Sequence, residues 1–135
     1  QDPFSHYSAV IPKFMNAFLK NEKPAVFGNG EQSRDFVYVD NVVEANLLAC
    51  NVNKGNGEVF NIGSGSQITL NQLIKLLNEI SGKSIEAEYQ KERQGDIMHS
   101  TADISKAKNM LGYDAKVGFK EGLKKTYEWY AKQTS

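Results

Sequence analysis

Two residues, Arg34 and Arg93, are the first candidates for chemistry in this sequence. The chain contains 16 lysines and arginines, and only these two are arginines. A guanidinium offers a planar fork of donors that matches a phosphate or carboxylate with two parallel hydrogen bonds, whereas an ammonium group acts as a point charge. The pattern favours two arginines that clamp a diphosphate. The alternative is two structural ion pairs, which are the commoner arrangement: Arg34 with Asp35 or Asp40, and Arg93 with Asp96.

The segments on either side of Arg34 would suit an anion. Phe36–Val39 is aromatic and β-branched, which predicts a strand. Asn41 and Glu44 have the spacing of a capping box, so a helix is expected to start directly after this strand. A helix N-terminus and a guanidinium near one edge would both attract a phosphate.

No other group of residues has the pattern of a catalytic or metal site. His6 and His99 lack the paired spacing of zinc ligands, and Asp96 with His99 supplies too few ligands for a metal. Gly63-Ser64-Gly65 lacks the G-x-S-x-G pattern of a hydrolase nucleophile. Cys50 is the only cysteine, so it forms no disulfide within the chain, and we expect it to be buried in an apolar helix. The residues therefore favour a binding surface over a catalytic one.

Helical and strand-like segments roughly alternate, which is typical of an α/β or α+β domain. One helix has a capping box, Thr69 with Gln72, and a stop at Gly82. In the helix that follows Asn41, the residues Val43, Leu47 and Leu48 are expected to share one apolar face. Helices are predicted over 8–21, 42–51, 70–81, 104–111 and 119–132, with an Asp103 cap on the fourth, and strands over 25–27, 36–39, 58–62 and 85–89.

The segment Glu58–Ile62 is the most strand-like in the chain, and we expect it to be fully buried. Too few strands accompany it to form a sheet, so it is expected to pair with a neighbouring chain or to rearrange locally. Gly63-Ser64-Gly65 follows it, but a G-x-G-x-x-G dinucleotide motif would need a glycine where Ile68 stands. The two glycines are expected to allow close backbone packing, and a role near a ligand stays open.

Composition indicates one globular domain over residues 1–135, with 40% hydrophobic residues and a formal net charge of zero. Neutral charge does not favour nucleic acid or an anionic membrane as a partner, and no apolar stretch has the length of a membrane span. A single cysteine is compatible with a reducing, cytoplasmic setting. The chain begins with Gln1 and enters a helical pattern at once, so we expect it to come from the middle of a longer polypeptide.

Five segments together resemble the carboxy-terminal part of the NAD-dependent epimerase/dehydratase family, the extended short-chain dehydrogenases/reductases. Three of them match the family in order: Ser33–Val42, Phe60–Gly65 and Arg93–Asp96. Two more, Tyr7–Phe14 and His99–Ala107, resemble the branch that contains the UDP-glucose and UDP-N-acetylglucosamine 4-epimerases.

The resemblance implies an α/β protein of Rossmann type in which this chain is the mixed α+β, substrate-binding portion. In the family, NAD binds an amino-terminal Rossmann half, and a Tyr-x-x-x-Lys pair with a Ser or Thr performs the chemistry. None of the six tyrosines here has a lysine four positions later. The chain is therefore expected to bind a UDP-sugar, with the NAD site and the catalytic residues in the absent half.

The resemblance also assigns roles to individual residues. Arg34 and Arg93 match the arginines that grip the diphosphate, and Asp96 matches the carboxylate that accepts hydrogen bonds from the ribose hydroxyls. The other matched positions surround the nucleotide: Ala9 and Val10 in the uridine pocket, Phe27 and Gly28 beside the uracil, Phe36 beside the nucleotide, and Leu70 at an apolar pocket position.

Ser100 falls where some epimerases restricted to glucose and galactose carry a bulky tyrosine. A small residue there implies room for an N-acetyl group on the sugar. Two alternatives remain open: a sugar-nucleotide dehydratase or decarboxylase of the same family, and a free-standing UDP-sugar-binding module that catalyses nothing.

Overall fold

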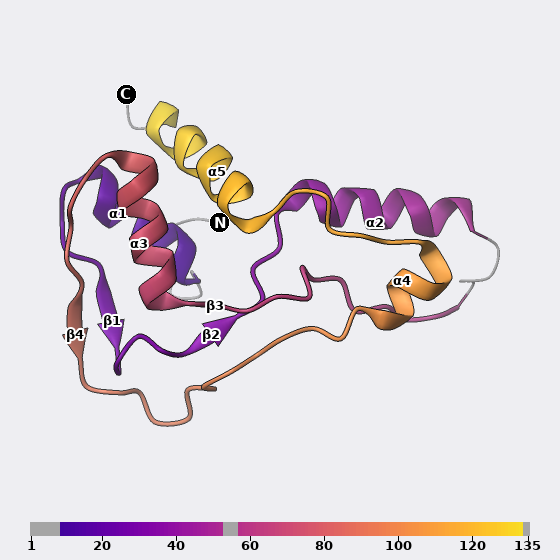
Figure 1. Ribbon diagram of the computed structural model, residues 1–135, viewed down its shortest axis with the longest axis horizontal. Coiled ribbons are helices and arrows are strands. Elements are labelled where there is room, and N and C mark those ends of the chain that lie inside the picture. The colour runs from indigo at the N-terminus through magenta and orange to yellow at the C-terminus, as the bar shows by residue number, and fades with distance from the viewer. Residues whose placement is uncertain (1–8, 53–56, 134–135) are drawn as a thin grey trace. The chain divides into compact units, whose positions relative to one another are not determined.

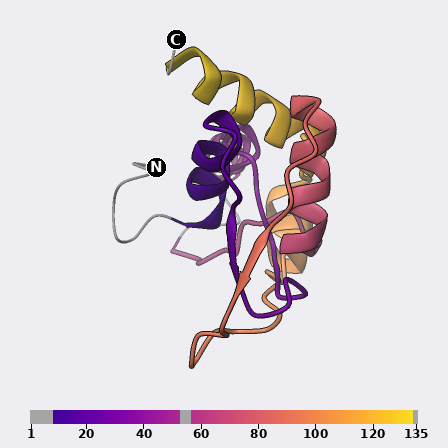
Figure 2. The same ribbon diagram turned by 90° about the vertical axis from the view of Figure 1, so that its left-hand side faces the viewer.

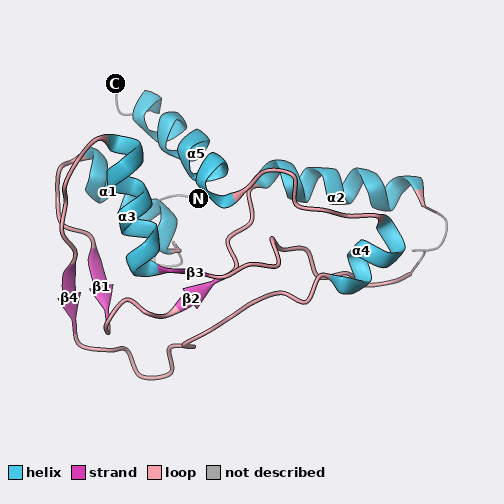
Figure 3. Cartoon of the chain, in the orientation of Figure 1, coloured by secondary structure: helices cyan, strands magenta, loops and turns pink. Residues whose placement is uncertain are grey.

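The computed structural model describes residues 9–52 and 57–133, and the chain divides into two compact units. The first unit contains Gln1–Gln32, Thr69–Met98 and Lys124–Ser135, and the second contains Ser33–Ile68 and His99–Leu123. Each unit is assembled from segments far apart in the sequence (Figure 1). Helices predominate over short strands (Figure 3), so the predicted α/β class is confirmed. Of the residues named in the predictions, His6, Tyr7 and the helix start at Ser8 lie outside the described residues.

The first unit combines two helices with a two-stranded parallel sheet. The helices are α1 (Val10–Leu19) and α3 (Leu70–Ser81), and the strands are β1 (Ala25–Phe27) and β4 (Glu88–Gln90). The strands pair in register from Ala25↔Glu88 to Phe27↔Gln90 and run side by side in Figure 2. Apolar residues at helical spacing, together with one strand residue, form the buried core: Phe14, Met15, Phe18, Val26, Leu73 and Leu77.

The ends of α3 follow the sequence prediction. The Thr69 hydroxyl accepts a hydrogen bond from the Gln72 backbone N–H, and the Gln72 side chain accepts one from the Thr69 N–H, so the capping box is present. Gly82 ends the helix in the left-handed conformation, at φ +67°. β4 is shorter than predicted because Asn78 bonds both the N–H and the C=O of Ile85, which keeps Ile85 out of a strand ladder.

The second unit is built around helices α2 (Val39–Asn51) and α4 (Ser105–Leu111). A short strand, β2 (Ser33–Arg34), pairs with β3 (Ile68–Thr69) and also bridges His99 in parallel. Helix α5 (Phe119–Gln133) begins in this unit and ends in the first. One cluster forms the core: Ala45, Ile104, Ala107, Leu111 and Tyr113.

The predicted strand over 36–39 is wrong, because β2 ends at Arg34 and α2 already begins at Val39. Asn41 is also not the helix cap. Its side chain is 2% exposed and makes two hydrogen bonds with Val117, to the carbonyl at 2.8 Å and from the N–H at 3.0 Å. A tertiary contact thus uses the amide that sequence spacing assigned to the helix end.

The predicted strand over 58–62 is wrong as well. The segment has no strand assignment, and Val59 is 82% exposed. Phe60 and Ile62 still pack against the core cluster, while Lys106 donates hydrogen bonds to the Glu58 carboxylate and the Val59 carbonyl. A strand needs a ladder partner, and the described part of the chain offers this segment none.

The apolar face predicted for α2 was also assigned incorrectly. Val43 and Leu47 are 51% and 56% exposed, whereas Leu48 packs against the core beside Ala45. Cys50, expected to be buried, is exposed. The fourth helix starts at Ser105 with Ile104 at its N-cap, although the Asp103 carboxylate does accept the Ser105 N–H at 2.9 Å.

Gly122 allows α5 to approach Tyr38. A Cβ at position 122 would lie 2.8 Å from the Tyr38 Cβ and 2.9 Å from its ring. Alanine normally stabilises a helix interior by about 1 kcal/mol relative to glycine. We expect Gly122→Ala to lower the free energy of unfolding instead, by about 2 kcal/mol, because overpacking forces the rigid ring to move. Urea unfolding monitored by circular dichroism measures the change, and a stabilised variant would contradict this close approach.

Candidate functional site

A cleft of about 140 Å³ opens in the first unit, where β1 and β4 end. Three of the residues predicted for ligand binding, Phe27, Gly28 and Asp96, line it. The remaining lining residues are Asn29, Gln32, Glu92, Ile97 and Met98. Sequence patterns marked the turn and the polar stretch that carry most of these residues, but Gln32 stands in no motif.

The β1 end of the cleft is held rigidly. The Phe27 carbonyl accepts a hydrogen bond from the Gln32 side chain at 2.6 Å, and Gln32 is only 7% exposed. The Gly28 N–H donates to the Gln90 carbonyl at 2.9 Å, and Gly28 then turns the chain at φ +84°, a conformation that favours glycine. The β1 end of the cleft is therefore fixed by one side-chain bond from Gln32 and one main-chain bond to Gln90.

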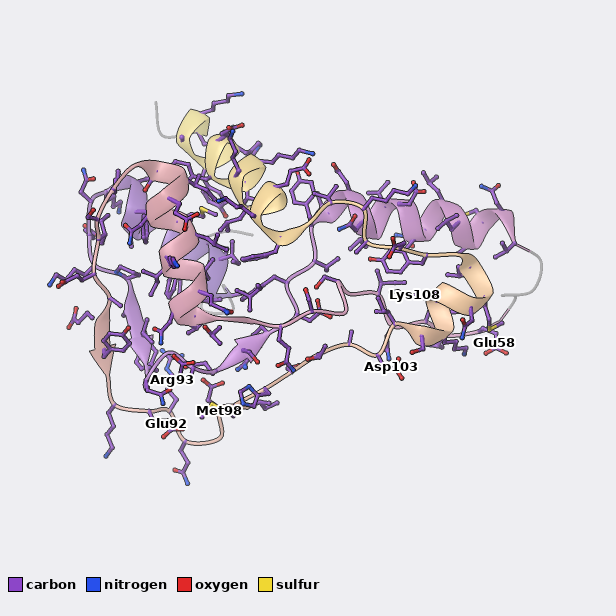
Figure 4. All side chains as sticks on the ribbon, viewed as in Figure 1. Glu58, Glu92, Arg93, Met98, Asp103 and Lys108 are labelled. Atoms are coloured by element: carbon purple, nitrogen blue, oxygen red, sulfur yellow. The ribbon has the colours of Figure 1, made fainter. Side chains whose placement is uncertain are left out.

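Arg93 lies in the loop that follows β4, which also carries Glu92 and Met98 (Figure 4). Its guanidinium carbon lies 3.6 Å from the centroid of the Phe27 ring, which is a cation–π contact. The Asp96 N–H donates to the Arg93 carbonyl at 3.2 Å, and Gly95 at φ +84° completes this tight turn. Folding thus stacks Arg93 on Phe27, and Phe27 and Asp96 line the same cleft.

Three other predicted residues of the first unit lie away from the lining of this cleft. Ala9 is the N-cap of α1 and Val10 is its first residue. Leu70 is 8% exposed in the core, and its N–H donates to the Gln32 carbonyl at 3.3 Å. Their roles in a uridine pocket stay predictions.

The remaining predicted residues belong to the second unit. Arg34 ends β2, and its Nη1 donates to the Ser33 carbonyl at 2.8 Å. The Phe36 ring stacks on Phe119, with ring centroids 5.3 Å apart. Ser100 is exposed, and its N–H donates to the Ser33 carbonyl at 3.2 Å.

Asp35 organises the glycine turn of the second unit. Its carboxylate accepts hydrogen bonds from the Ser64 N–H at 2.7 Å, the Ser64 hydroxyl at 2.5 Å, the Gly65 N–H at 3.0 Å and the Ala102 N–H at 3.3 Å. A Cβ on Gly63 would lie 2.5 Å from the same carboxylate, so the expected close packing at this glycine is confirmed. Since Asp35 takes both turn N–H groups, this turn does not fit the pyrophosphate of a dinucleotide such as NAD.

Tyr113 adds one hydrogen bond to the same glycine turn. Its hydroxyl donates to the Gly63 carbonyl at 2.7 Å, and the side chain is 1% exposed. Burial, followed by the charges of Asp35 and Asp114, raises the pKa of the Tyr113 hydroxyl above its ordinary value. The hydroxyl therefore stays protonated and able to donate at neutral pH.

The residues that the structure describes contain neither a metal-ligand cluster nor a membrane-spanning helix. Over 9–52 and 57–133, no three His, Cys, Asp or Glu side chains gather closely enough to hold a metal ion. Within the same residues, no helix combines the length and apolar character needed to cross a membrane.

Comparison with known proteins gives matches over nearly the whole chain. A family model described as GDP-mannose 4,6 dehydratase matches residues 3–126. The putative UDP-glucose 4-epimerase of Methanocaldococcus jannaschii is 40% identical over 129 residues, which cover 96% of this chain and 41% of that protein. The chain therefore spans about two fifths of the length of this relative.

Solved structures match as closely. The UDP-glucose 4-epimerase of Thermotoga maritima with UDP-glucose aligns at a TM-score of 0.91 and 47% identity, over 100% of this chain and 43% of its own. The UDP-N-acetylglucosamine 4-epimerase of Methanobrevibacter ruminantium, in complex with UDP-N-acetylmuramic acid, aligns at a TM-score of 0.90 and 39% identity. The alignment covers 98% of this chain and 42% of that protein. Other related epimerase structures contain NAD.

Proposed function

Because the chain belongs to the GDP-mannose 4,6-dehydratase family of NAD-dependent epimerases and dehydratases, we propose that it is the UDP-sugar-binding part of a UDP-hexose 4-epimerase. The observation that carries the proposal is the cleft at the ends of β1 and β4, which Phe27 and Asp96 line, with Arg93 stacked on the Phe27 ring. A guanidinium, an aromatic ring and a carboxylate suit, in turn, a diphosphate, a base and the hydroxyls of a ribose.

The proposed roles follow this chemistry. Arg93 and Arg34 bind the diphosphate, Phe27 and Gly28 lie beside the uracil, and Asp96 accepts from the ribose. The remaining assignments rest on the family resemblance: Ala9 and Val10 in the uridine pocket, Phe36 beside the nucleotide, and Leu70 at an apolar pocket position. NAD is the cofactor of this family, and we place its site in a part of the whole protein other than this chain.

Two further proposals concern surroundings. We place the protein in the cytoplasm, and we expect the segment at 58–62 to pair with a neighbouring chain, in a homo-oligomer or by strand exchange. The strand-like composition of this segment supports the second proposal, since the described part of the chain offers it no ladder partner.

Calorimetric titration of the chain with UDP, UDP-N-acetylglucosamine and NAD tests the function. We expect UDP and the UDP-sugar to bind and NAD not to bind. Absence of binding to UDP would contradict the proposal for this chain alone, and NAD binding would contradict the placement of the cofactor site.

A dehydratase is the second candidate, since the matching family model carries that description. Epimerases and dehydratases of this family share the nucleotide-binding residues, so UDP binding does not separate them. An assay of the whole protein for release of a 4-keto-6-deoxy sugar distinguishes the two: a dehydratase forms it and an epimerase does not.

Ser100 is expected to set the tolerance for an N-acetyl group. Ser100→Tyr should lower the affinity for UDP-N-acetylglucosamine by about tenfold or more and leave the affinity for UDP-glucose nearly unchanged. A bulky ring would fill space that only the larger sugar needs. Calorimetry with both ligands measures the ratio, and Ser100→Ala, which keeps the space, serves as the control. Equal weakening of the two ligands would contradict the role.

A further inference from the structure

We infer that Phe27 is a positioning residue for Arg93: its ring holds the guanidinium in place for the diphosphate before the ligand arrives. This inference rests on the proposed function and adds to the role of Phe27 beside the base. The observation behind it is the 3.6 Å separation between the Arg93 guanidinium carbon and the Phe27 ring centroid.

The geometry of the contact leaves Arg93 able to bind. A separation of 3.6 Å is close to the contact distance of two carbon atoms, so the guanidinium lies with its face toward the ring. The donors of a guanidinium point outward in its own plane. A stacked Arg93 therefore keeps its N–H groups available to phosphate oxygens while its orientation is restricted.

Hydrogen bonds hold the main chain that carries the Phe27 ring. Phe27 pairs in register with Gln90 across the β1–β4 sheet, and its carbonyl accepts the bond from the buried Gln32 amide. The following N–H, of Gly28, is bonded to the Gln90 carbonyl. These bonds fix the main chain of Phe27 and Gly28, and with it the point from which the ring extends toward the arginine.

The benefit is entropic. A free arginine side chain loses rotamer entropy when it is ordered, and a ligand normally has to offset that cost. The turn closed by the Asp96 N–H and the Arg93 carbonyl already restricts the backbone of Arg93. The stack restricts the side chain as well, so less ordering remains when a diphosphate binds.

A double-mutant cycle tests the inference. Dissociation constants for UDP and for uridine would be measured by calorimetry for the wild type, Phe27→Leu, Arg93→Ala and the double variant. We expect Phe27→Leu to raise the dissociation constant of UDP by about five- to tenfold and that of uridine by a smaller factor. In the Arg93→Ala background, the effect of Phe27→Leu on UDP should fall to its effect on uridine. Phe27→Tyr keeps the ring and should retain the coupling to Arg93 that Phe27→Leu loses.

Three outcomes would count against the inference, and they are distinguishable. Equal effects of Phe27→Leu on UDP in both backgrounds would mean that Phe27 acts through the base alone. Resonances of the Arg93 side chain that lack an upfield ring-current shift in the free chain, or keep the same shift in Phe27→Leu, would mean that the stack is not formed in solution. No UDP binding by the wild type would overturn the proposed function, and this inference with it.

Discussion

Arg93→Ala is expected to raise the dissociation constant of UDP by about ten- to hundredfold, and Arg34→Ala by a similar factor. Hydrogen bonds to charged groups contribute about 1.5–3 kcal/mol each, which corresponds to this range. The planar fork matters beyond the charge, so Arg93→Lys should recover only part of the affinity. Calorimetry at fixed salt measures the constants, since contacts with phosphate depend on ionic strength.

Lys91 provides the matched control for Arg93. It is an exposed cation at the end of the same strand, two positions earlier. Lys91→Ala removes the same charge but no proposed contact, so the UDP affinity should change by less than about twofold. If Lys91→Ala and Arg93→Ala weakened UDP equally, general electrostatic attraction would explain the binding and the clamp would be wrong. Uridine, which has no phosphate, should respond weakly to either arginine variant.

Asp35→Ala is expected to have the largest effect on stability, a loss of about 2–4 kcal/mol. The substitution leaves the N–H groups of Ser64, Gly65 and Ala102 without their acceptor, whereas the Ser64 hydroxyl keeps its bonds with Ser66. Donors left unsatisfied in a folded protein cost about 1–3 kcal/mol each, and partial exposure of this turn reduces the sum. Asp35→Asn keeps one acceptor oxygen and should have a smaller effect.

Local hydrogen exchange gives the sharpest measurement of this loss. The amides of Ser64, Gly65 and Ala102 should exchange much faster in Asp35→Ala, while urea unfolding reports the total change. Asp114→Ala is the control, because its side chain is 76% exposed and its ion pair with Lys108 is long, at 3.9 Å. That variant should change stability by less than about 0.5 kcal/mol. Unchanged exchange at all three amides would show that the Asp35 network is not structural.

Local sequence patterns were sufficient for the elements that local forces decide. The apolar spacing of α1 and α3, the Thr69 capping box and the Gly82 stop all depend on residues within a few positions of one another. β1 was also predicted correctly, since it lies between a Lys-Pro break and a glycine turn. These features need no partner from elsewhere in the chain.

Tertiary contacts decided the elements that were predicted incorrectly. Asn41 resembled a helix cap, yet Val117, 76 residues away, takes both ends of its amide. The segment at 58–62 has the composition of a strand, but composition cannot supply a ladder partner. Val43 and Leu47 looked like core residues because hydrophobic spacing does not reveal which of two apolar faces finds a neighbour.

The candidate site divides in the same way. Residue type alone singled out the two rare arginines, and the resemblance to the family added Phe27 before the glycine turn and Asp96 after Gly95. Only the tertiary structure decided that Arg93 stacks on Phe27, 66 positions earlier, because that contact follows from the parallel register of β1 and β4. It also decided that Asp35 serves the glycine turn, since the four donors that surround the carboxylate come from segments that fold together.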